Sequence, residues 1–313
     1  MTRLVVDIGG TNTRAALAEG PAIIEDSIRR YRNDGFDGLC SVLMRFLAEA
    51  GSPRIDGACA ALAGPVQGGR GRLTNLDWSI DAADIARVTG ADRVRLLNDL
   101  QAQGHALDQL EPDALVPVLD GPRAPGGVRL VIGLGTGVNV TVVHRTPTGR
   151  LVTANEAGHV SLPVASEDDL SLARFAAGED GFAAVEDVLA GRGLATLYGW
   201  VTARAGATRR LEGPAIIAAA PGDPAAELAL RSYTAMLGRV AGDLALHHLP
   251  YGGIYLIGGV ARAMTPHLAR LGLDDSFRAK GRLSGLMENF AIATITDDFA
   301  ALRGCAAHLA ETA

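Results

Sequence analysis

Apolar residues gather in short runs along the chain, and glycine or polar residues separate these runs. Residues 3–8 (RLVVDI) and 13–18 (TRAALA) are two such runs, and two glycines lie between them. Short apolar runs on either side of a glycine turn predict a β-hairpin. A second hairpin is predicted from residues 130–132 and 138–143, which flank the segment GLGTG. Further short strands are predicted at 59–62, 94–97 and 254–257.

Longer stretches rich in Ala and Leu predict helices between these strands. We expect helices at 81–89, 260–270 and 299–311 and mostly helical regions at 168–205 and 224–249. Ser79 is a possible N-cap of the first helix. Residues 111–127 contain several prolines and the run GPRAPGG, which predicts a linker. Strands mixed with helices in this way indicate an α/β fold.

The two predicted hairpins are similar in sequence. LVVDIGGTNTRAAL from Leu4 and LVIGLGTGVNVTVV from Leu130 share an apolar strand, a glycine turn and a second strand, and Gly9 matches Gly135. An internal repeat of this kind predicts two lobes that each begin with a hairpin and offer its turn to one cleft. We expect a small lobe at 1–109 plus 298–313 and a large lobe at 110–297.

The composition removes several classes of function. The chain has 313 residues, a net charge of −6 and no basic stripe, so we expect no nucleic acid partner. No apolar run approaches the roughly 20 residues of a membrane helix and no secretion signal is recognisable, so we expect a cytoplasmic protein without a membrane partner. Lys280 is the only lysine, which excludes a GxxxxGK[ST] phosphate loop. Cys40, Cys59 and Cys305 lack the CxxC spacing of a zinc cluster.

The two glycine turns are candidate phosphate sites. Backbone N–H groups in a tight glycine turn point outward together, and glycine has no Cβ to keep a phosphate away. The segment Gly9-Gly10-Thr11-Asn12 adds a hydroxyl and an amide, and Gly135-Thr136-Gly137 repeats the arrangement. Either turn alone could be a plain hairpin, but two matched glycine–threonine turns favour phosphate binding.

Asp7 ends the first apolar strand directly before the first turn. A carboxylate beside phosphate groups would repel them unless a cation lies between, and Mg²⁺ is commonly held by one or two carboxylates, phosphate oxygens and water. Asp7 is therefore a candidate Mg²⁺ ligand, although it could instead cap the turn by accepting its N–H groups. Gly258-Gly259 lies between a predicted strand and a helix, where the bare backbone suits a flat ring or a ribose as well as a simple turn.

Several motifs together resemble a known family. DIGGTNTR, GLGTGVNV and GGIYLIGGVARAM are similar to the phosphate-1, phosphate-2 and adenosine motifs of the actin–hexokinase–heat-shock ATPase superfamily. Five further segments resemble those of bacterial ATP-dependent glucokinases: ALAGPV (61–66), LTNLDW (73–78), LLNDLQAQGHAL (96–107), NEAGHVSLP (155–163) and VEDVLAGRGLATLY (185–198). Ala157 and Arg262 depart from the family pattern, which often has glycine and proline there.

The resemblance implies a two-lobed actin-like ATPase fold, related to ribonuclease H, with a cleft between the lobes. Most of the nucleotide site and part of the sugar site would lie on the large lobe. The ATP site would comprise Asp7, Ile8, Gly9, Gly10, Thr11, Asn12, Gly135, Thr136, Gly137, Gly258 and Gly259, with Mg²⁺ held by Asp7 through water. The glucose site would comprise Asn98, Asp99, Glu156, His159 and Glu186. The resemblance also implies a homodimer.

The implied activity is transfer of the γ-phosphoryl group of MgATP to the 6-hydroxyl of D-glucose, the first step of glycolysis. Asp99 is our candidate for the general base that accepts the proton of this hydroxyl. Simpler roles stay open for the same residues. Asn98 and Asp99 could cap the following helix, and Glu186 could be a solvated helix residue. Glu156 and His159 have the i, i+3 spacing of a helical metal site, but the residues around them favour a loop.

Three alternative functions stay open as well. The acceptor could be another hexose or an amino sugar, and the donor could be polyphosphate, because polyphosphate-dependent enzymes share these turns. A non-catalytic sugar sensor is a second alternative, but it would need neither a base at Asp99 nor Mg²⁺ at Asp7. A chaperone or filament ATPase is a third, for which 313 residues leave little room.

Overall fold

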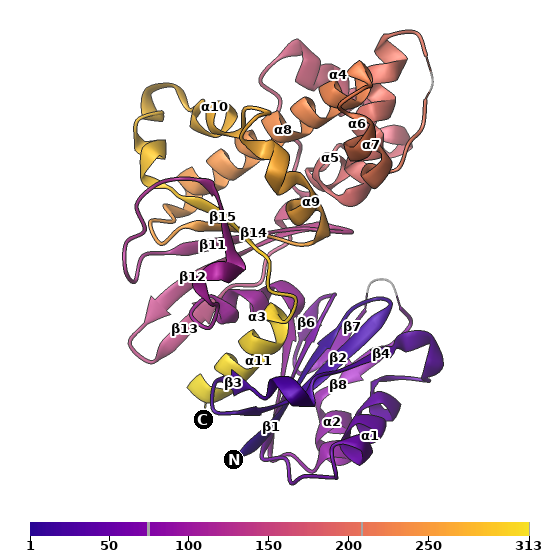
Figure 1. Cartoon of the computed structure of the whole chain (residues 1–313), viewed down its shortest axis with the longest axis vertical. Coiled ribbons are helices and arrows are strands. Elements are labelled where there is room, and N and C mark those ends of the chain that lie inside the picture. Colours follow the sequence, from indigo (N-terminus) through magenta and orange to yellow (C-terminus); the bar gives the residue numbers. More distant parts are fainter. Residues whose placement is uncertain (74–75, 208, 313) are drawn as a thin grey trace. The chain divides into compact units, whose positions relative to one another are not determined.

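The structure is a computed structural model that describes residues 1–73, 76–207 and 209–312. Thr74 and Asn75 of the LTNLDW motif lie outside the described residues. The chain forms two compact units (Figure 1), of which unit 1 comprises Met1–Pro112, Thr146–Ala154 and Asp297–Ala313, and unit 2 comprises Asp113–Arg145 and Asn155–Thr296. Residues 146–154, which the expected boundaries include in the large lobe, thus group with unit 1.

Unit 1 is built on a mixed sheet with the strand order β3–β2–β1–β5–β9, and β4 also pairs with β2. These strands are β1 (Thr2–Ile8), β2 (Asn12–Glu19), β3 (Ala22–Ile23), β4 (Arg29–Arg32), β5 (Gly57–Leu62) and β9 (Arg93–Asn98). β1 and β2 are antiparallel and form the predicted first hairpin, whereas β1, β5 and β9 are parallel. A small antiparallel sheet contains β6 (Val66–Gln67), β7 (Arg70–Arg72) and β8 (Ser79–Asp81).

Both faces of the unit 1 sheet carry a hydrophobic core because β1 is apolar on both sides. Val6 packs in a core with Phe46, whereas its neighbour Val5 packs in another core with Leu302. The helices of this unit are α1 (Leu39–Glu49), α2 (Ala82–Thr89), α3 (Asp99–Ala106) and α11 (Ala300–Glu311). β1 is thus buried on both faces of the sheet. This explains why the run LVV at the start of the chain shows no alternation with polar residues.

The helix predicted at 81–89 is present as α2, but its predicted N-cap is wrong. The side chain of Asp81 caps the helix by accepting the N–H of Ala83 over 2.9 Å. Ser79 instead begins β8. Serine and aspartate are both favoured N-caps, so the sequence could not separate two candidates that lie two residues apart.

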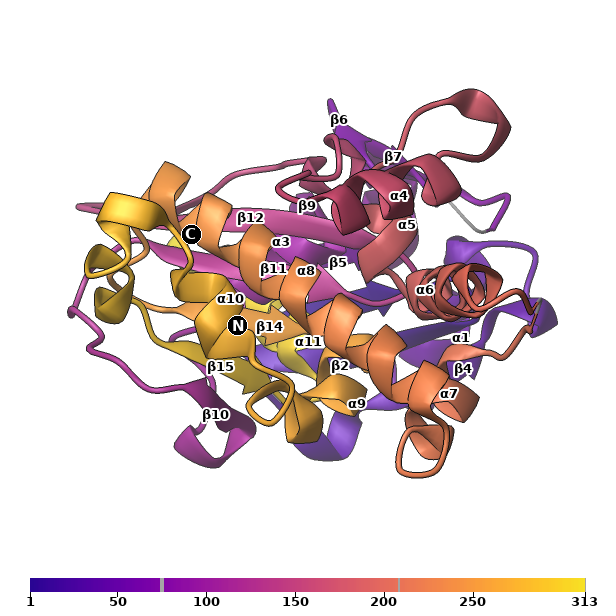
Figure 2. The same cartoon turned by 90° about the horizontal axis from the view of Figure 1, so that it is seen from above.

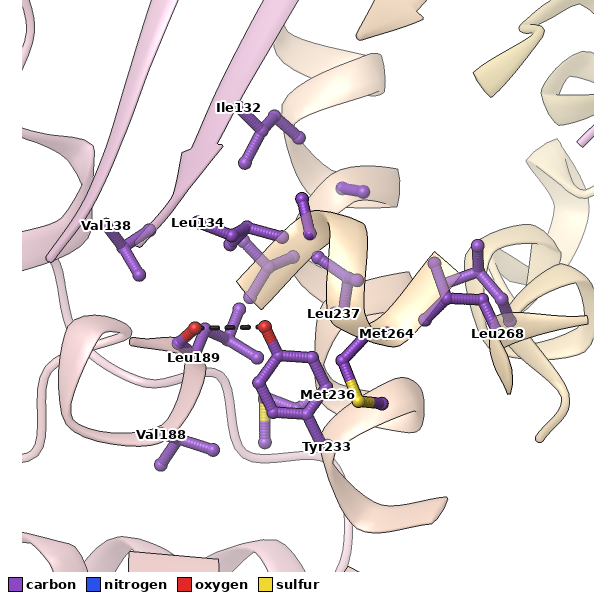
Figure 3. Close-up of a cluster of buried hydrophobic side chains, with 14 of the residues drawn as sticks. Ile132, Leu134, Val138, Val188, Leu189, Tyr233, Met236, Leu237, Met264 and Leu268 are labelled. Carbon is purple, nitrogen blue, oxygen red and sulfur yellow. Dashed lines mark hydrogen bonds between the residues drawn. The ribbon is translucent and has the colours of Figure 1, made fainter. Parts of the chain in front are cut away.

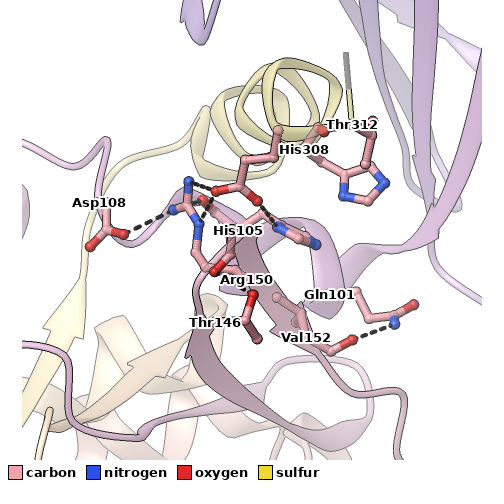
Figure 4. A network of polar contacts seen from close by, with 10 residues as sticks. Gln101, His105, Asp108, Thr146, Arg150, Val152, His308 and Thr312 are labelled. Atoms are coloured by element: carbon pink, nitrogen blue, oxygen red, sulfur yellow. Dashed lines mark hydrogen bonds and ion pairs between the residues drawn. The ribbon is translucent and has the colours of Figure 1, made fainter.

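Arg150 ties three parts of unit 1 together (Figure 4). It lies on β13 (Gly149–Val152) and donates to the carbonyl of His105 over 2.8 Å and to the carboxylates of Asp108 and Glu311 over 3.1 and 2.6 Å. Gln101 donates to the carbonyl of Val152, also on β13, over 3.0 Å. β13 therefore contacts α3 at Gln101 and His105, and Arg150 also joins β13 to Glu311 at the end of α11.

His105 is buried in the contact between α3 and α11. Its ring lies 4.5 Å from that of His308, measured between ring centres. Burial, together with the neighbouring His308 and Arg150, lowers the pKa of His105 to about 3, so this ring is neutral at physiological pH.

Unit 2 repeats the strand pattern of unit 1. The strands that its sheet takes from this unit have the order β10–β15–β14–β11–β12, with β11 and β12 antiparallel and β11, β14 and β15 parallel. These strands are β10 (Leu115–Leu119), β11 (Arg129–Leu134), β12 (Val138–Thr146), β14 (Ile254–Ile257) and β15 (Ile292–Ile295). The order and directions of β12–β11–β14–β15 match those of β2–β1–β5–β9, which agrees with the internal repeat found in the sequence.

The linker predicted at 111–127 is wrong in its first half, because β10 lies there and pairs antiparallel with β15. Pro117 lies in this strand, and the pairing shifts between Pro117 and Leu119. Proline is tolerated at a sheet edge or a bulge, so it does not exclude a strand there. The GPRAPGG run is a loop, and it is anchored by the N–H of Ala124, which donates to the carbonyl of Tyr251 over 2.7 Å.

Several helices of unit 2 pack against the long helix α8 (Figure 2). The helices of this unit are α4 (Glu167–Ala176), α5 (Glu186–Leu189), α6 (Gly191–Arg204), α7 (Gly213–Ala219), α8 (Pro224–His248), α9 (Gly259–Leu268) and α10 (Leu273–Arg278). α8 contacts α5, α6, α7 and α10. Tyr233 of α8 is fully buried in the apolar core and donates its hydroxyl to the carbonyl of Leu189 over 3.0 Å (Figure 3).

Candidate functional site

The first glycine turn joins β1 to β2 in unit 1. The N–H of Gly9 donates to the carbonyl of Asn12 over 3.0 Å, which closes the turn. Within the described part of the chain, the N–H groups of Gly10 and Thr11 donate to no other group of the protein. Thr11 is exposed. The turn therefore presents two N–H groups that can bind an anion, which is what phosphate binding requires.

Asn33, which was not predicted from the sequence, stabilises this turn through hydrogen bonds. Its side-chain amide donates to the carbonyl of Gly9 over 2.8 Å, and its backbone N–H donates to the carbonyl of Thr11 over 2.9 Å. The hydroxyl of Thr13 donates to the side-chain oxygen of Asn33 over 2.8 Å. Asn33 and Thr13 are both buried, so their hydrogen bonds fix the shape of the turn.

Asp7 lies one residue before the last paired residue of β1 and is partly buried. It forms an ion pair with Arg14 on β2, with 3.3 Å between Arg14 Nη1 and Asp7 Oδ2. Burial raises the pKa of Asp7, and Arg14 opposes this rise. Among the described residues, no backbone N–H of the turn donates to Asp7, so the alternative in which it caps the turn is not what the structure shows.

Asn98 and Asp99 lie where β9 ends and α3 begins. Asn98 is the N-cap of α3, because its side-chain oxygen accepts the N–H of Leu100 over 3.0 Å and Gln101 completes a capping box. Its side-chain amide also donates to the carbonyl of Gly64 over 3.2 Å. The helix-capping role that the sequence left open for Asn98 is therefore present, and it fixes the start of the helix that carries Asp99.

Asp99 has a raised proton affinity. Its pKa is raised to about 6 from an ordinary value of 3.8, mainly by burial and also by the nearby carboxylate of Asp7, whereas the N–H of Leu100 opposes the shift. The Leu100 N–H donates to Asp99 Oδ1 over 2.8 Å. A carboxylate with a pKa near 6 is still mostly ionised at neutral pH and is a better proton acceptor than an ordinary aspartate.

The parallel strands of unit 1 bring these residues to one edge of the sheet. Ile8 of β1 pairs beside Leu62 of β5, and Leu62 pairs beside Asn98 of β9. Asp7 and the first glycine turn consequently lie at the carboxyl end of β1, and Asp99 lies at the carboxyl end of β9, with β5 between the two strands. This edge is where ligands bind in many open α/β sheets.

The second glycine turn joins β11 to β12 in unit 2. The N–H of Gly135 donates to the carbonyl of Gly137 over 3.0 Å. Thr136 and Gly137 are exposed, and in the described parts of the chain their N–H groups have no acceptor from the protein. The second turn thus offers an anion the same kind of donors as the first.

Gly258 brings the end of β14 against the second turn. Its φ is +109°, and a Cβ at this position would lie 2.2 Å from the carbonyl oxygen of Leu134. Only glycine can occupy this position. Gly259 begins α9 and has open space where a side chain would be, so the backbone here is bare, as adenosine binding would require.

Three residues that the resemblance assigns to the sugar lie near the start of β12. Glu186 begins α5, and its Oε2 accepts the N–H of Val138 over 2.9 Å. Glu156 and His159 are exposed, and Glu156 Oε2 lies 3.4 Å from the side-chain amide of Asn139.

The segment with Glu156 and His159 packs closely on β12. A Cβ on Gly158 would lie 1.9 Å from the carbonyl oxygen of Val138. The segment forms only a short 3₁₀ turn (Ala157–His159), as the predicted loop requires, and no group of three or more metal-ligating side chains occurs among the described residues.

The environment of Lys280 and the character of the helices limit the possible functions. Lys280 is buried, and its Nζ lies 2.6 Å from Asp243 Oδ1 and 3.0 Å from the carbonyl oxygen of Arg239, so the one lysine serves a structural ion pair. Among the described helices, none combines the length and the apolar character needed to span a membrane.

The chain matches the Glucokinase family over residues 4–312. A glucokinase of Chromobacterium violaceum is 33% identical over 99% of this chain and 89% of its own length. A glucokinase of Marinobacter nauticus is 32% identical over 97% of this chain and 95% of its own length.

Solved structures of glucokinases have the same fold. A glucokinase from an Antarctic psychrotroph superposes with a TM-score of 0.88 at 28% identity, covering 98% of both chains. A glucokinase from Balamuthia mandrillaris in complex with glucose superposes with a TM-score of 0.80 at 22% identity, covering 100% of this chain and 94% of the other. The α/β fold class predicted from the sequence is confirmed.

Proposed function

This chain belongs to the glucokinase family, whose members are ATP-dependent sugar kinases, and we propose that Asp99 is the general base of the reaction. The substrates are D-glucose and ATP, and the products are glucose 6-phosphate and ADP. The observation that carries the assignment of Asp99 is its position at the same end of the sheet as the first glycine turn and Asp7, whose carboxylate acts on the pKa of Asp99.

Asp99 would accept the proton of the glucose 6-hydroxyl while the oxygen attacks the γ-phosphorus of ATP. One bond forms between this oxygen and phosphorus, the bond from phosphorus to the β,γ-bridging oxygen breaks, and ADP leaves with the electron pair. The partial burial and the neighbouring Asp7 raise the pKa of Asp99 toward neutrality, where a general base is most effective. General-base assistance is typically worth about 10²–10⁴-fold in rate.

The sugar is held by groups that match hydroxyls. Each hydroxyl of a hexose both donates and accepts, and leaving a partner unpaired in a buried site costs about 1–3 kcal/mol. Carboxylates, an amide and an imidazole supply the required acceptors and donors, and we assign this role to Asn98, Asp99, Glu156, His159 and Glu186. Asn98 uses its oxygen to cap α3, so its contact with sugar would come from its side-chain amide, which now donates to Gly64.

The phosphates of ATP bind the two glycine turns in this proposal. Phosphoryl transfer spreads negative charge over the phosphoryl oxygens, and fixed N–H donors stabilise this charge without reorganisation. The N–H groups of Gly10, Thr11, Thr136 and Gly137 are suitably free, and the bare backbone at Gly258 and Gly259 would face the adenosine. Ile8 and Asn12, which flank the first turn, complete the proposed ATP site.

Three further properties form part of the proposal. Mg²⁺ would be held through water by Asp7, whose carboxylate lies beside the first turn and provides the oxygen donor that this ion prefers, and it would offset phosphate charge. A homodimer is expected from the family resemblance, and light scattering of the purified protein tests it. A cytoplasmic location is expected from the sequence, and fractionation of cells that express the protein tests it.

A matrix of phosphoryl donors and sugar acceptors tests the proposed activity. Purified protein is incubated with ATP, GTP or polyphosphate and with glucose, mannose, fructose or N-acetylglucosamine, and the phosphorylated sugar is measured directly. We expect the highest kcat/KM for the pair of ATP and glucose. A higher kcat/KM with another sugar or donor would overturn the proposed substrates.

A further inference from the structure

We propose that the second glycine turn sets the position of Glu186 and therefore controls glucose affinity even when no nucleotide is bound. Glu186 would be the link between the part of unit 2 that binds phosphate and the part that binds sugar. The inference rests on the proposed function, in which Glu186 contacts glucose. It adds Gly137, Val138 and Arg192 to the residues that position the sugar.

Each oxygen of the Glu186 carboxylate has its own donor. Oε2 accepts the backbone N–H of Val138 over 2.9 Å, and Oε1 accepts a guanidinium N–H of Arg192 over 2.7 Å. The Glu186 side chain is 13% exposed, whereas that of Arg192 is 57% exposed. A hydrogen bond to a charged group is stronger than one between neutral groups, so these two contacts hold the carboxylate in one orientation.

The turn and the segment that carries Glu186 are also joined through the backbone. The N–H of Gly191, at the start of α6, donates to the carbonyl of Gly135 over 2.8 Å. The chain from Glu186 to Gly191 is thus bonded to both ends of the turn, at Gly135 and at Val138. A displacement of the turn would therefore move the Glu186 carboxylate as well.

Gly137 lies directly against the carboxylate. A Cβ added to Gly137 would lie 2.7 Å from Glu186 Oε2, closer than any stable contact between a carbon and an oxygen. The obstructing atom is the end of a flexible side chain, so the fold can accommodate alanine at position 137 by turning Glu186 away. Glu186 then loses its hydrogen bond to Val138.

Gly135 provides a matched control in the same turn. A Cβ added to Gly135 meets nothing within 4 Å, and its φ lies outside the region that only glycine tolerates. Gly135→Ala therefore adds the same methyl group to the same turn without touching Glu186. The two alanine variants separate an effect on the carboxylate from an effect on the turn in general.

The link implies that the two substrates influence each other. If phosphate binding at the turn changes glucose affinity by some factor, glucose must change nucleotide affinity by the same factor. The residues that carry this coupling all belong to unit 2.

Titration calorimetry of glucose into the full-length protein, without nucleotide, tests the proposal. We expect Gly137→Ala to weaken glucose binding by about tenfold or more, because a hydrogen bond to a charged group contributes about 1.5–3 kcal/mol. We expect Gly135→Ala to bind glucose within about twofold of the unchanged protein. Equal affinity of Gly137→Ala and the unchanged protein would overturn the proposal, and so would an equal loss in both alanine variants.

Arg192 allows a second test that does not alter the turn. Arg192→Gln should weaken glucose binding by up to about fivefold, since an exposed ion pair contributes about 0.2–1 kcal/mol, and Arg192→Lys should restore part of the loss. Unchanged affinity in Arg192→Gln would remove Arg192 from the proposal. Absence of glucose binding by the unchanged protein would instead contradict the proposed function, so the two failures are distinguishable.

Discussion

Replacing Asp99 by asparagine separates its proposed chemical role from its structural role. Asparagine has the same shape, and its side-chain oxygen can still accept the N–H of Leu100, which lies 2.8 Å from Asp99 Oδ1. It cannot take up a proton from a hydroxyl. We expect Asp99→Asn to fold and to retain glucose binding, with kcat reduced by at least about 10²-fold.

The same substitution should stabilise the folded protein at alkaline pH. The pKa of Asp99 is raised from 3.8 to about 6 in the folded protein, chiefly by burial, so the folded state binds this proton more tightly than the unfolded chain. The contribution of the Asp99 carboxyl group to the free energy of unfolding is therefore complete below about pH 4, and it is lost as the pH rises through about 6. One pKa unit corresponds to about 1.4 kcal/mol, so the loss is about 1–3 kcal/mol for this partly exposed carboxyl group.

Asparagine stays neutral at every pH and avoids this loss. The free energy of unfolding of Asp99→Asn should exceed that of the unchanged protein by about 1–3 kcal/mol at pH 8 and by much less at pH 4. Urea unfolding at both pH values measures this difference, and a coupled ADP-release assay measures kcat. Asp92→Asn is the control, because Asp92 is exposed in the same unit and the substitution should change neither quantity.

Two results would refute the reasoning. Near-normal turnover of Asp99→Asn would show that Asp99 is not the base. An unfolding free energy that differs from that of the unchanged protein by the same amount at pH 4 and pH 8 would show that the carboxyl group has an ordinary pKa in the folded protein.

Three further substitutions test other parts of the structure. Asn33→Ala should raise the KM for ATP by about tenfold with little change in the KM for glucose, because Asn33 shapes the first glycine turn through hydrogen bonds of about 1 kcal/mol each. Arg150→Met should lower the free energy of unfolding by about 2–4 kcal/mol, since it leaves the partly buried Glu311 carboxylate without its cation. Tyr233→Phe should lower it by about 1–2 kcal/mol, because the buried carbonyl of Leu189 loses its donor.

Each of these substitutions has an outcome that contradicts its explanation. An equal rise in both KM values for Asn33→Ala would indicate general damage rather than an effect on the turn. A double variant, Arg150→Met with Glu311→Gln, should recover part of the stability, and a further loss instead would argue against the ion pair. Unchanged urea unfolding of Tyr233→Phe would show that its hydroxyl contributes nothing to the core.

The sequence predicted β1, β2, β5, β9, β11, β12 and β14 but not the other strands, which include β15 inside the second sheet. Both hairpins and β14 were predicted within one or two residues except at the end of β12, because short apolar runs beside glycine are strong local signals. β10 was mistaken for a linker because prolines around residues 111–127 suggested a break. Pairing with β15, which is distant in the sequence, decides that a strand forms there.

The candidate site was predictable where a motif is local and not where it depends on tertiary contacts. The glycine turns and Asp99 stand in continuous motifs. Asn33 was missed because it reaches the first turn only through the pairing of β4 with β2. Arg192 was missed because an exposed arginine has no distinctive pattern, and its contact with Glu186 depends on how α5 and α6 meet.

A crystal structure with glucose and a non-hydrolysable ATP analogue tests the central assignment most directly. The account predicts an oxygen of Asp99 about 2.6–3.2 Å from the 6-hydroxyl oxygen of glucose, with the phosphates of the analogue bound by N–H groups of both glycine turns. It would be contradicted by an Asp99 carboxylate that does not contact the sugar, or by phosphates bound away from either turn.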